Sequence, residues 1–132
     1  MGMKQILVMM AVVVLVGQSV VADDKLIADP IVEKAVRKEL KKPEGQLTVA
    51  DLAKVTALGL TASKSTDAGL KEVAKLQNLK HLWLDNTRIT DAGLMEIAKL
   101  QQLEGLYLEG TRITDAGLKE LAKLQNLKGL SL

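Results

Sequence analysis

The chain has 132 residues, of which 48% are hydrophobic and 2% aromatic, and its 18 basic and 16 acidic side chains give a formal net charge of +2. This length allows one domain, whose core must consist of Leu, Ile, Val and Ala because Phe is absent. The small and evenly interspersed charge argues against a nucleic-acid partner, and the absence of cysteine excludes disulfides, a thiolate nucleophile and Cys-ligated zinc.

Residues 1–22 have the anatomy of an export signal. Lys4 supplies a positive charge, Ile6 to Val16 form an apolar run, and the small residues up to Ala22 offer a cleavage site. The alternative is an uncleaved anchor, but the run of eleven apolar residues is shorter than the roughly 20 that cross a membrane. The sequence therefore predicts a secreted or periplasmic protein, cleaved after Ala22, that keeps no membrane span.

Residues 23–48 are predicted to be largely helical. Asp29 and Pro30 place an N-cap before a proline at the first helical position, and KKPEG ends the helix that follows. Thr48 and Asp51 then have the spacing of a cap for a second helix. The residues expected to line the inner face of the first helix are Ile31, Ala35, Val36 and Leu40.

Residues 49–132 are periodic. The motif TDAGL begins at Thr66, Thr90 and Thr114, which gives a period of 24 and is typical of a solenoid. The pattern L-x-x-L-x-L recurs with the same period, at Leu79-Leu82-Leu84, Leu103-Leu106-Leu108 and Leu127-Leu130-Leu132, and less perfectly at Val55-Leu58-Leu60. Its last two leucines alternate as in a strand, whereas the apolar residues after TDAGL have helical spacing. Each repeat is predicted to be a short strand followed by a helix.

These motifs resemble the leucine-rich repeat family, in the form whose helix opens with T-D-x-G-L, over about two thirds of the chain. The resemblance implies a short right-handed α/β solenoid of about three and a half repeats, with a parallel concave sheet and convex helices. The segment from Asp29 to Leu52 resembles the helical N-terminal cap of exported bacterial proteins of this kind, including the internalins. Ser63, Thr87 and Thr111 replace the family's usual Asn, and we expect their hydroxyls to form a comparable ladder.

The only two aromatic residues, Trp83 and Tyr107, occupy one repeat position. If the leucines on either side of each point inward, the two-residue period of a strand sends both rings onto the concave face. There they would form an aromatic ridge on neighbouring strands, flanked by Gly59 and Ser131. Trp and Tyr are enriched where interfaces concentrate their binding energy, so we expect a partner contact. Cross-strand stacking alone is the structural alternative.

Charged side chains border this ridge. Asp85 and Glu109 are predicted to form an acidic row, which we expect to be solvated and neutralised by the arginines past the turn, because two carboxylates alone are a poor calcium site. His81 lies about 13 Å along its strand from Asp85, too far for a catalytic triad. We therefore expect no enzyme activity, cofactor or metal. The predicted partner-binding residues are Trp83, Tyr107, His81, Asp85, Glu109, Arg88 and Arg112.

The predicted function is a noncatalytic binding module outside the cytoplasm. A protein partner is favoured because the family that the repeats resemble mostly makes protein contacts. The alternatives are a glycan that stacks on the same rings and a structural repeat without a ligand. The sequence stops at Leu132, at a strand without the helix or cap expected after it. We expect a fragment of a longer array, or otherwise an edge covered by another chain, such as a homodimer.

Overall fold

The computed structural model describes residues 25–132. The predicted export signal, with its cleavage site at Ala22, lies outside these residues. The elements of the described chain are, in order, α2 (Pro30–Leu40), α3 (Val49–Ala53), β1 (Ala57–Gly59), α4 (Asp67–Val73), β2 (His81–Trp83), α5 (Asp91–Ile97), β3 (Gly105–Tyr107), α6 (Asp115–Leu118), the 3-10 helix η2 (Lys119–Lys123) and β4 (Gly129–Ser131).

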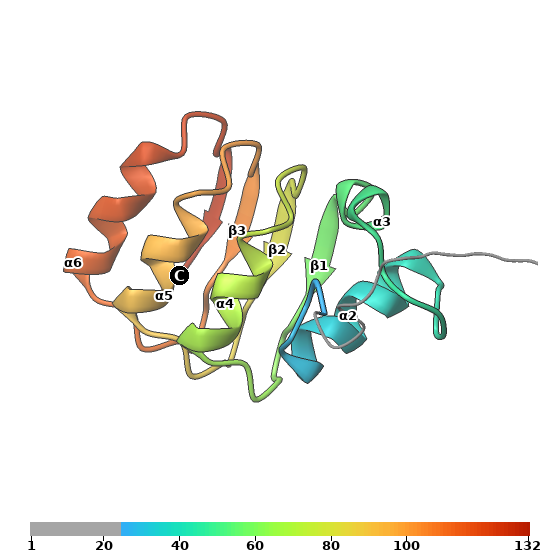
Figure 1. Ribbon diagram of the computed structural model, residues 1–132. Helices are drawn as coiled ribbons and strands as arrows, with labels where there is room; N and C mark the ends of the chain where they lie inside the picture. The colour runs from blue at the N-terminus through green and yellow to red at the C-terminus, as the bar shows by residue number, and fades with distance from the viewer. Residues whose placement is uncertain (1–24) are drawn as a thin grey trace, which may run out of the picture.

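The four strands form one parallel sheet in the order β1-β2-β3-β4. Residues 24 apart are paired, as in Leu58 with Leu82 and Leu82 with Leu106. Helices α4, α5 and α6 lie along one face of this sheet, and α2 and α3 lie at its β1 end (Figure 1). The predicted alternation of strand and helix in an α/β solenoid is confirmed.

The leucines of the repeat fill the space between the sheet and the helices. Leu82, Leu84 and Leu106 are 0% exposed, and Leu108 is 2% exposed. The core of the described chain holds Leu, Ile, Val and Ala and no aromatic side chain, as the composition predicted. Leu130 of β4 is 44% exposed because this strand pairs with β3 alone. The apolar pattern of the sequence therefore identified the inward row of each strand.

The TDAGL motif forms a hydrogen-bond ladder between repeats. Asp67 accepts hydrogen bonds from the backbone N–H of Thr90 (2.8 Å) and from its hydroxyl (2.5 Å). Asp91 accepts the same two bonds from Thr114, and these bonds lower the pKa of Asp91 below its ordinary value of 3.8, the hydroxyl contributing most. Each aspartate thus joins the start of its own helix to the start of the next one.

The glycine of TDAGL makes room for this ladder. A side chain on Gly93 would place its Cβ 2.6 Å from Oδ1 of Asp67, which is closer than carbon and oxygen can approach. Gly69 meets Oδ2 of Asp29 in the same way, at 2.9 Å. The carboxylate of Asp29, which precedes α2, therefore lies against the glycine of α4 in the same way that the carboxylate of Asp67 lies against the glycine of α5. The sequence identified the motif but not the reason that its fourth position, two residues after the aspartate, needs a glycine.

Two of the three hydroxyls that replace the family's asparagine bond to backbone groups of the turn, as expected. Thr87 donates to the carbonyl oxygen of Leu84 (2.7 Å) and Thr111 donates to that of Leu108 (2.6 Å). Ser63 differs, because it shares a hydrogen bond with Ser65 (2.7 Å). Each of these bonds lies within its own turn.

The N-terminal segment begins as the sequence predicted. Asp29 caps α2 by accepting from the N–H groups of Ile31 and Val32, and the expected inner face packs on the core. The sequence reasoning missed Val32, which is 0% exposed. Helix α2 contacts β1 and α4, so it covers the first strand of the sheet.

Helix α3 opens with the predicted capping box of Thr48 and Asp51. Asp51 also accepts a hydrogen bond from Lys42 (2.7 Å), and this bond, followed by the one from the Thr48 backbone, lowers the pKa of Asp51 to about 2. The turn after α2 is thereby tied to the start of α3.

The last repeat differs from the other two in its helix. Helices α4 and α5 each have seven residues, whereas α6 has four and continues as the 3-10 helix η2. Helix α5 packs against a neighbour on both sides, α4 and α6, whereas α6 packs against α5 and its own continuation η2. Packing on both sides favours the regular α-helix, since short helices depend on tertiary contacts.

Candidate functional site

The two aromatic residues stack on the concave face of the sheet. Trp83 of β2 pairs with Tyr107 of β3, and their rings lie with centroids 5.3 Å apart and planes 5° apart. Both side chains are half-buried, whereas Leu82 and Leu106 beside them point into the core. The alternation of β2 and β3 therefore places both rings on the side of the sheet opposite the helices.

His81 extends this stack along β2. Its ring lies 5.9 Å from that of Trp83, with an angle of 27° between the planes. A Cβ on Gly105 would lie 2.6 Å from Nδ1 of His81 and 3.2 Å from the Tyr107 hydroxyl. These two side chains thus occupy the space above Gly105. We use "aromatic ridge" below for His81, Trp83 and Tyr107.

The strands on either side of the aromatic ridge carry only small side chains, or none, on this face. Gly59 of β1 pairs with Trp83, and Ser131 of β4 pairs with Tyr107. A Cβ added to Gly59 or to Gly129 would meet no atom within 4 Å. The ridge therefore stands above open surface on both sides, as the sequence predicted.

The two predicted acidic residues have different environments. Asp85 accepts a hydrogen bond through Oδ1 from the backbone N–H of Glu109 (2.9 Å), so it stabilises the turn of the neighbouring repeat. The carboxylate of Glu109 is exposed and has no hydrogen-bond or ion-pair partner among residues 25–132. Of the pair, Glu109 is the one available to a partner.

Arg88 and Arg112 are exposed on the far side of the turn. The expectation that they neutralise the acidic row is wrong, because neither forms an ion pair with Asp85 or Glu109 in the described part of the chain. The backbone of Arg112 instead forms a parallel bridge with that of Thr90. The two arginines are exposed at the same place in successive repeats, in the turns that follow β2 and β3.

Two further features bear on the kind of site. Among residues 25–132, no group of three or more His, Asp or Glu side chains is placed to hold a metal ion. In the same range no helix has the length and apolar character needed to cross a membrane.

Comparison with known proteins agrees with this architecture. A family model described as "Leucine Rich repeat" matches residues 75–98, which include β2 and α5. Internalin C2 (inlC2) of Listeria monocytogenes is similar in structure, with a TM-score of 0.56 and 29% identity over 80% of this chain and 54% of that one. A second internalin of this organism, inlF, has a TM-score of 0.56 and 22% identity over 81% of this chain and 37% of that one. No curated protein matches the sequence.

The parallel sheet, the repeat and these similarities define an α/β leucine-rich-repeat solenoid. The chain is internalin-like, and it spans about half or less of the length of the two internalins. Solenoids of this kind are built as extended surfaces for binding, and they are typically noncatalytic.

Proposed function

We propose that the protein is a noncatalytic binding module that acts outside the cytoplasm and binds a protein partner through the concave face. One observation carries the proposal: the only two aromatic rings of the chain stack on that face between two bare strands, while the core contains none. Trp and Tyr supply large contact areas and keep a polar group for hydrogen bonding. The predicted export signal supports the location.

The remaining predicted residues follow the two ring-bearing strands. The exposed side chains of Glu109, Arg88 and Arg112, which form no ion pair within residues 25–132, provide charges of both signs in the turns after β2 and β3. Such a polar rim around an apolar centre is the usual arrangement of protein interfaces. We assign Asp85 a supporting role, because its carboxylate is already hydrogen-bonded to the neighbouring turn.

We further propose that residues 25–48 act as the N-terminal cap of the solenoid. Helix α2 covers β1, and Asp29 contacts Gly69 as Asp67 contacts Gly93 in the next repeat. The backbone of Leu26 and Ala28 accepts from Lys75 and donates to Glu72, which fastens the segment to α4. An end covered in this way does not expose the core leucines of the first repeat.

The test is retention of partners from a cell-envelope extract on the immobilised protein. Replacing Trp83 and Tyr107 by Ala should abolish retention of a protein that the native chain holds. The matched control replaces Val49 and Met95, which are 73% and 57% exposed on other surfaces, and should retain it. Loss with the control variant as well, or no loss with the ridge variant, would contradict a concave binding site.

The fluorescence of Trp83 separates a protein partner from a glycan, because Trp83 is the only tryptophan. A glycan would change this fluorescence in a titration with envelope polysaccharides, and the change would disappear in Tyr107→Ala if the sugar stacks on both rings. We expect no such change for a protein-binding ridge. If neither extract proteins nor polysaccharides bind, the structural alternative without a ligand holds.

Self-association is the alternative that does not involve the concave face. Leu130 of β4 and Leu132, which follows this strand, are 44% and 62% exposed, and β4 is paired on one side in this structure. Apolar exposure at an unpaired strand favours edge-to-edge contact. Sedimentation of the native chain and of Leu130→Asp tests a homodimer, which the substitution would disperse.

A further inference from the structure

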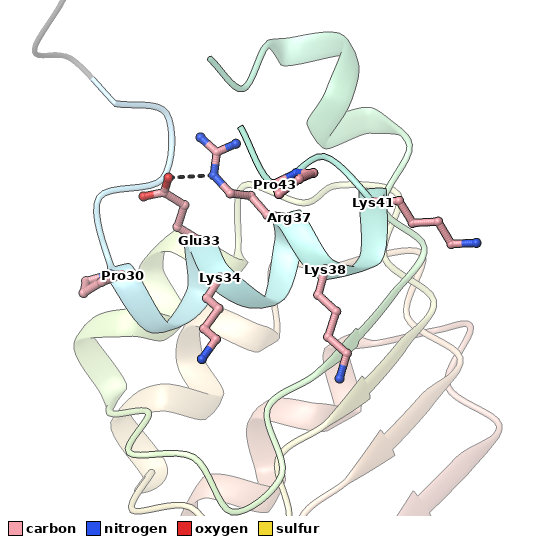
Figure 2. Close-up of a pocket in the computed structure, with 7 residues that line it drawn as sticks. All are labelled: Pro30, Glu33, Lys34, Arg37, Lys38, Lys41 and Pro43. Atoms are coloured by element: carbon pink, nitrogen blue, oxygen red, sulfur yellow. Dashed lines mark hydrogen bonds and ion pairs between the residues drawn. The ribbon is translucent and has the colours of Figure 1, made fainter. Parts of the chain in front are cut away.

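Helix α2 has a basic outer face directly opposite its buried face. Val32 and Val36 are 0% exposed against the core, whereas Lys34, Lys38 and Lys41 are exposed. Lys34 and Lys38 are four residues apart and lie in one stripe of the helix, and Lys41 follows as its C-cap, in the left-handed conformation with φ 55°. Figure 2 shows Lys34 and Lys38 extended in the same direction from the helix, and Lys41 extended in another direction from the helix end.

The other cations of this region are used within the protein. Arg37 donates to Oε2 of Glu33 (2.9 Å) and to the carbonyl oxygens of Lys42 (3.1 Å) and Gly45 (2.8 Å). The bond from Arg37, aided by the charge of Lys25, lowers the pKa of Glu33. Lys42 is held by Asp51 (2.7 Å). These bonds fix the turn after α2 and leave its outer face to the three lysines.

Lys34, Lys38 and Lys41 have no ion-pair partner within residues 25–132. The acidic side chains nearby do not neutralise them, because Asp29 caps the helix and Glu33 binds Arg37. Glu39 lies about 100° around the helix from Lys38, away from the stripe. The basic face is therefore produced by the arrangement of the charges rather than by a large net charge.

A shallow hollow of about 620 Å³ accompanies this face. Its lining consists of Pro30, Glu33, Lys34, Arg37, Lys38, Lys41 and Pro43. The lysine stems and the two proline rings provide apolar groups in this lining. Lysines with this arrangement can rest their stems on an interfacial layer while the charged ends meet anions.

We propose that this basic face of α2 docks on the anionic surface of a phospholipid membrane. Charge complementarity supports an anionic partner, and lysines on the convex outer side of a helix suit a flat surface better than a groove-bound polymer. The predicted export signal directs the chain to a membrane, which makes an anionic lipid surface the favoured partner.

Vesicle co-sedimentation of the full chain tests this surface. We compare vesicles of phosphatidylglycerol and phosphatidylcholine with vesicles of phosphatidylcholine alone, so that any contribution of the apolar N-terminal segment is common to both. A lysine near an anionic surface strengthens binding about fivefold, so the three lysines should contribute on the order of 100-fold at low salt. The preference for anionic vesicles should fall as salt is added, because exposed charges are screened.

The variant Lys34→Gln, Lys38→Gln, Lys41→Gln should lose most of the preference for anionic vesicles. The matched control, Lys71→Gln, Lys119→Gln, Lys128→Gln, removes the same charge from exposed lysines of the repeats and should keep it. Equal losses in the two variants, or no loss in the first, would overturn the proposal. It would also fail if inorganic polyphosphate bound through these lysines while the native chain showed no preference for anionic vesicles.

Discussion

The helix starts have the same residues in every copy of TDAGL, whereas the concave face of the sheet has different residues in each repeat. At the helix starts the residues are identical in all three copies of TDAGL, and each aspartate that precedes another copy bonds to the threonine of that copy. On the concave face the paired positions 59, 83, 107 and 131 hold Gly, Trp, Tyr and Ser. Positions that form contacts between repeats thus hold the same residue in each repeat. Positions on the surface that we propose for binding hold different residues.

The largest expected effect is a difference in stability between substitutions at two neighbouring residues of β2, one in the core and one on the concave face. Leu82 has a leucine in every repeat and is 0% exposed, so Leu82→Ala should lower the free energy of unfolding by about 2–5 kcal/mol. Trp83→Ala removes a stacked ring from the surface and should lower it by about 1 kcal/mol or less. Urea denaturation monitored by circular dichroism measures both, and equal losses would contradict the comparison.

Two glycines provide the next test. Gly93 recurs in each TDAGL and lies against Asp67, so the Cβ of Gly93→Ala would clash and lower the free energy of unfolding by about 1–3 kcal/mol. Ala is otherwise the better helix former, which makes a loss informative. Gly59→Ala is the control, since its Cβ meets no atom within 4 Å, and it should change stability by less than about 0.5 kcal/mol. A stabilised Gly93→Ala would show that the ladder tolerates a side chain there.

The smallest expected effect is a pH dependence at the helix starts. The pKa of Asp91 is lowered by the Thr114 hydroxyl and then by the Thr114 N–H, so its carboxylate stabilises the fold when ionised. This contribution is present above the ordinary pKa of 3.8 and is lost as the pH falls through the lower pKa of the folded state. Thermal melts should show that Asp91→Asn destabilises the protein at neutral pH and has less effect in acid.

Asp115 serves as the control for this experiment. It has the same place in its repeat, but its carboxylate accepts no side-chain or threonine hydrogen bond in the described chain. Asp115→Asn should therefore leave the dependence of the melting temperature on pH close to that of the native protein. A similar change in both variants would argue that the ladder is not the source of the effect.

The sequence predicted more of the fold than of the candidate site. The position of each strand, the inward leucines and the capped starts of α2 and α3 followed from local patterns, because apolar periodicity and capping act over a few residues. The stacking of Trp83 on Tyr107 also followed, since a period of 24 brings equivalent positions of neighbouring strands together. The environments of Asp85 and of the arginines did not follow from any local pattern.

By itself, the sequence determined the repeat, the row that each residue occupies and the bare strands beside the aromatic ridge, because these depend on periods of 2 and 24 residues. Only the tertiary structure decided where polar side chains form their bonds. Asp67 turns toward Thr90, Asp85 turns toward the Glu109 backbone, and Arg37 holds the turn after α2. A flexible polar side chain has several partners within reach, and stacking of the repeats selects among them by distance and geometry that no single repeat contains.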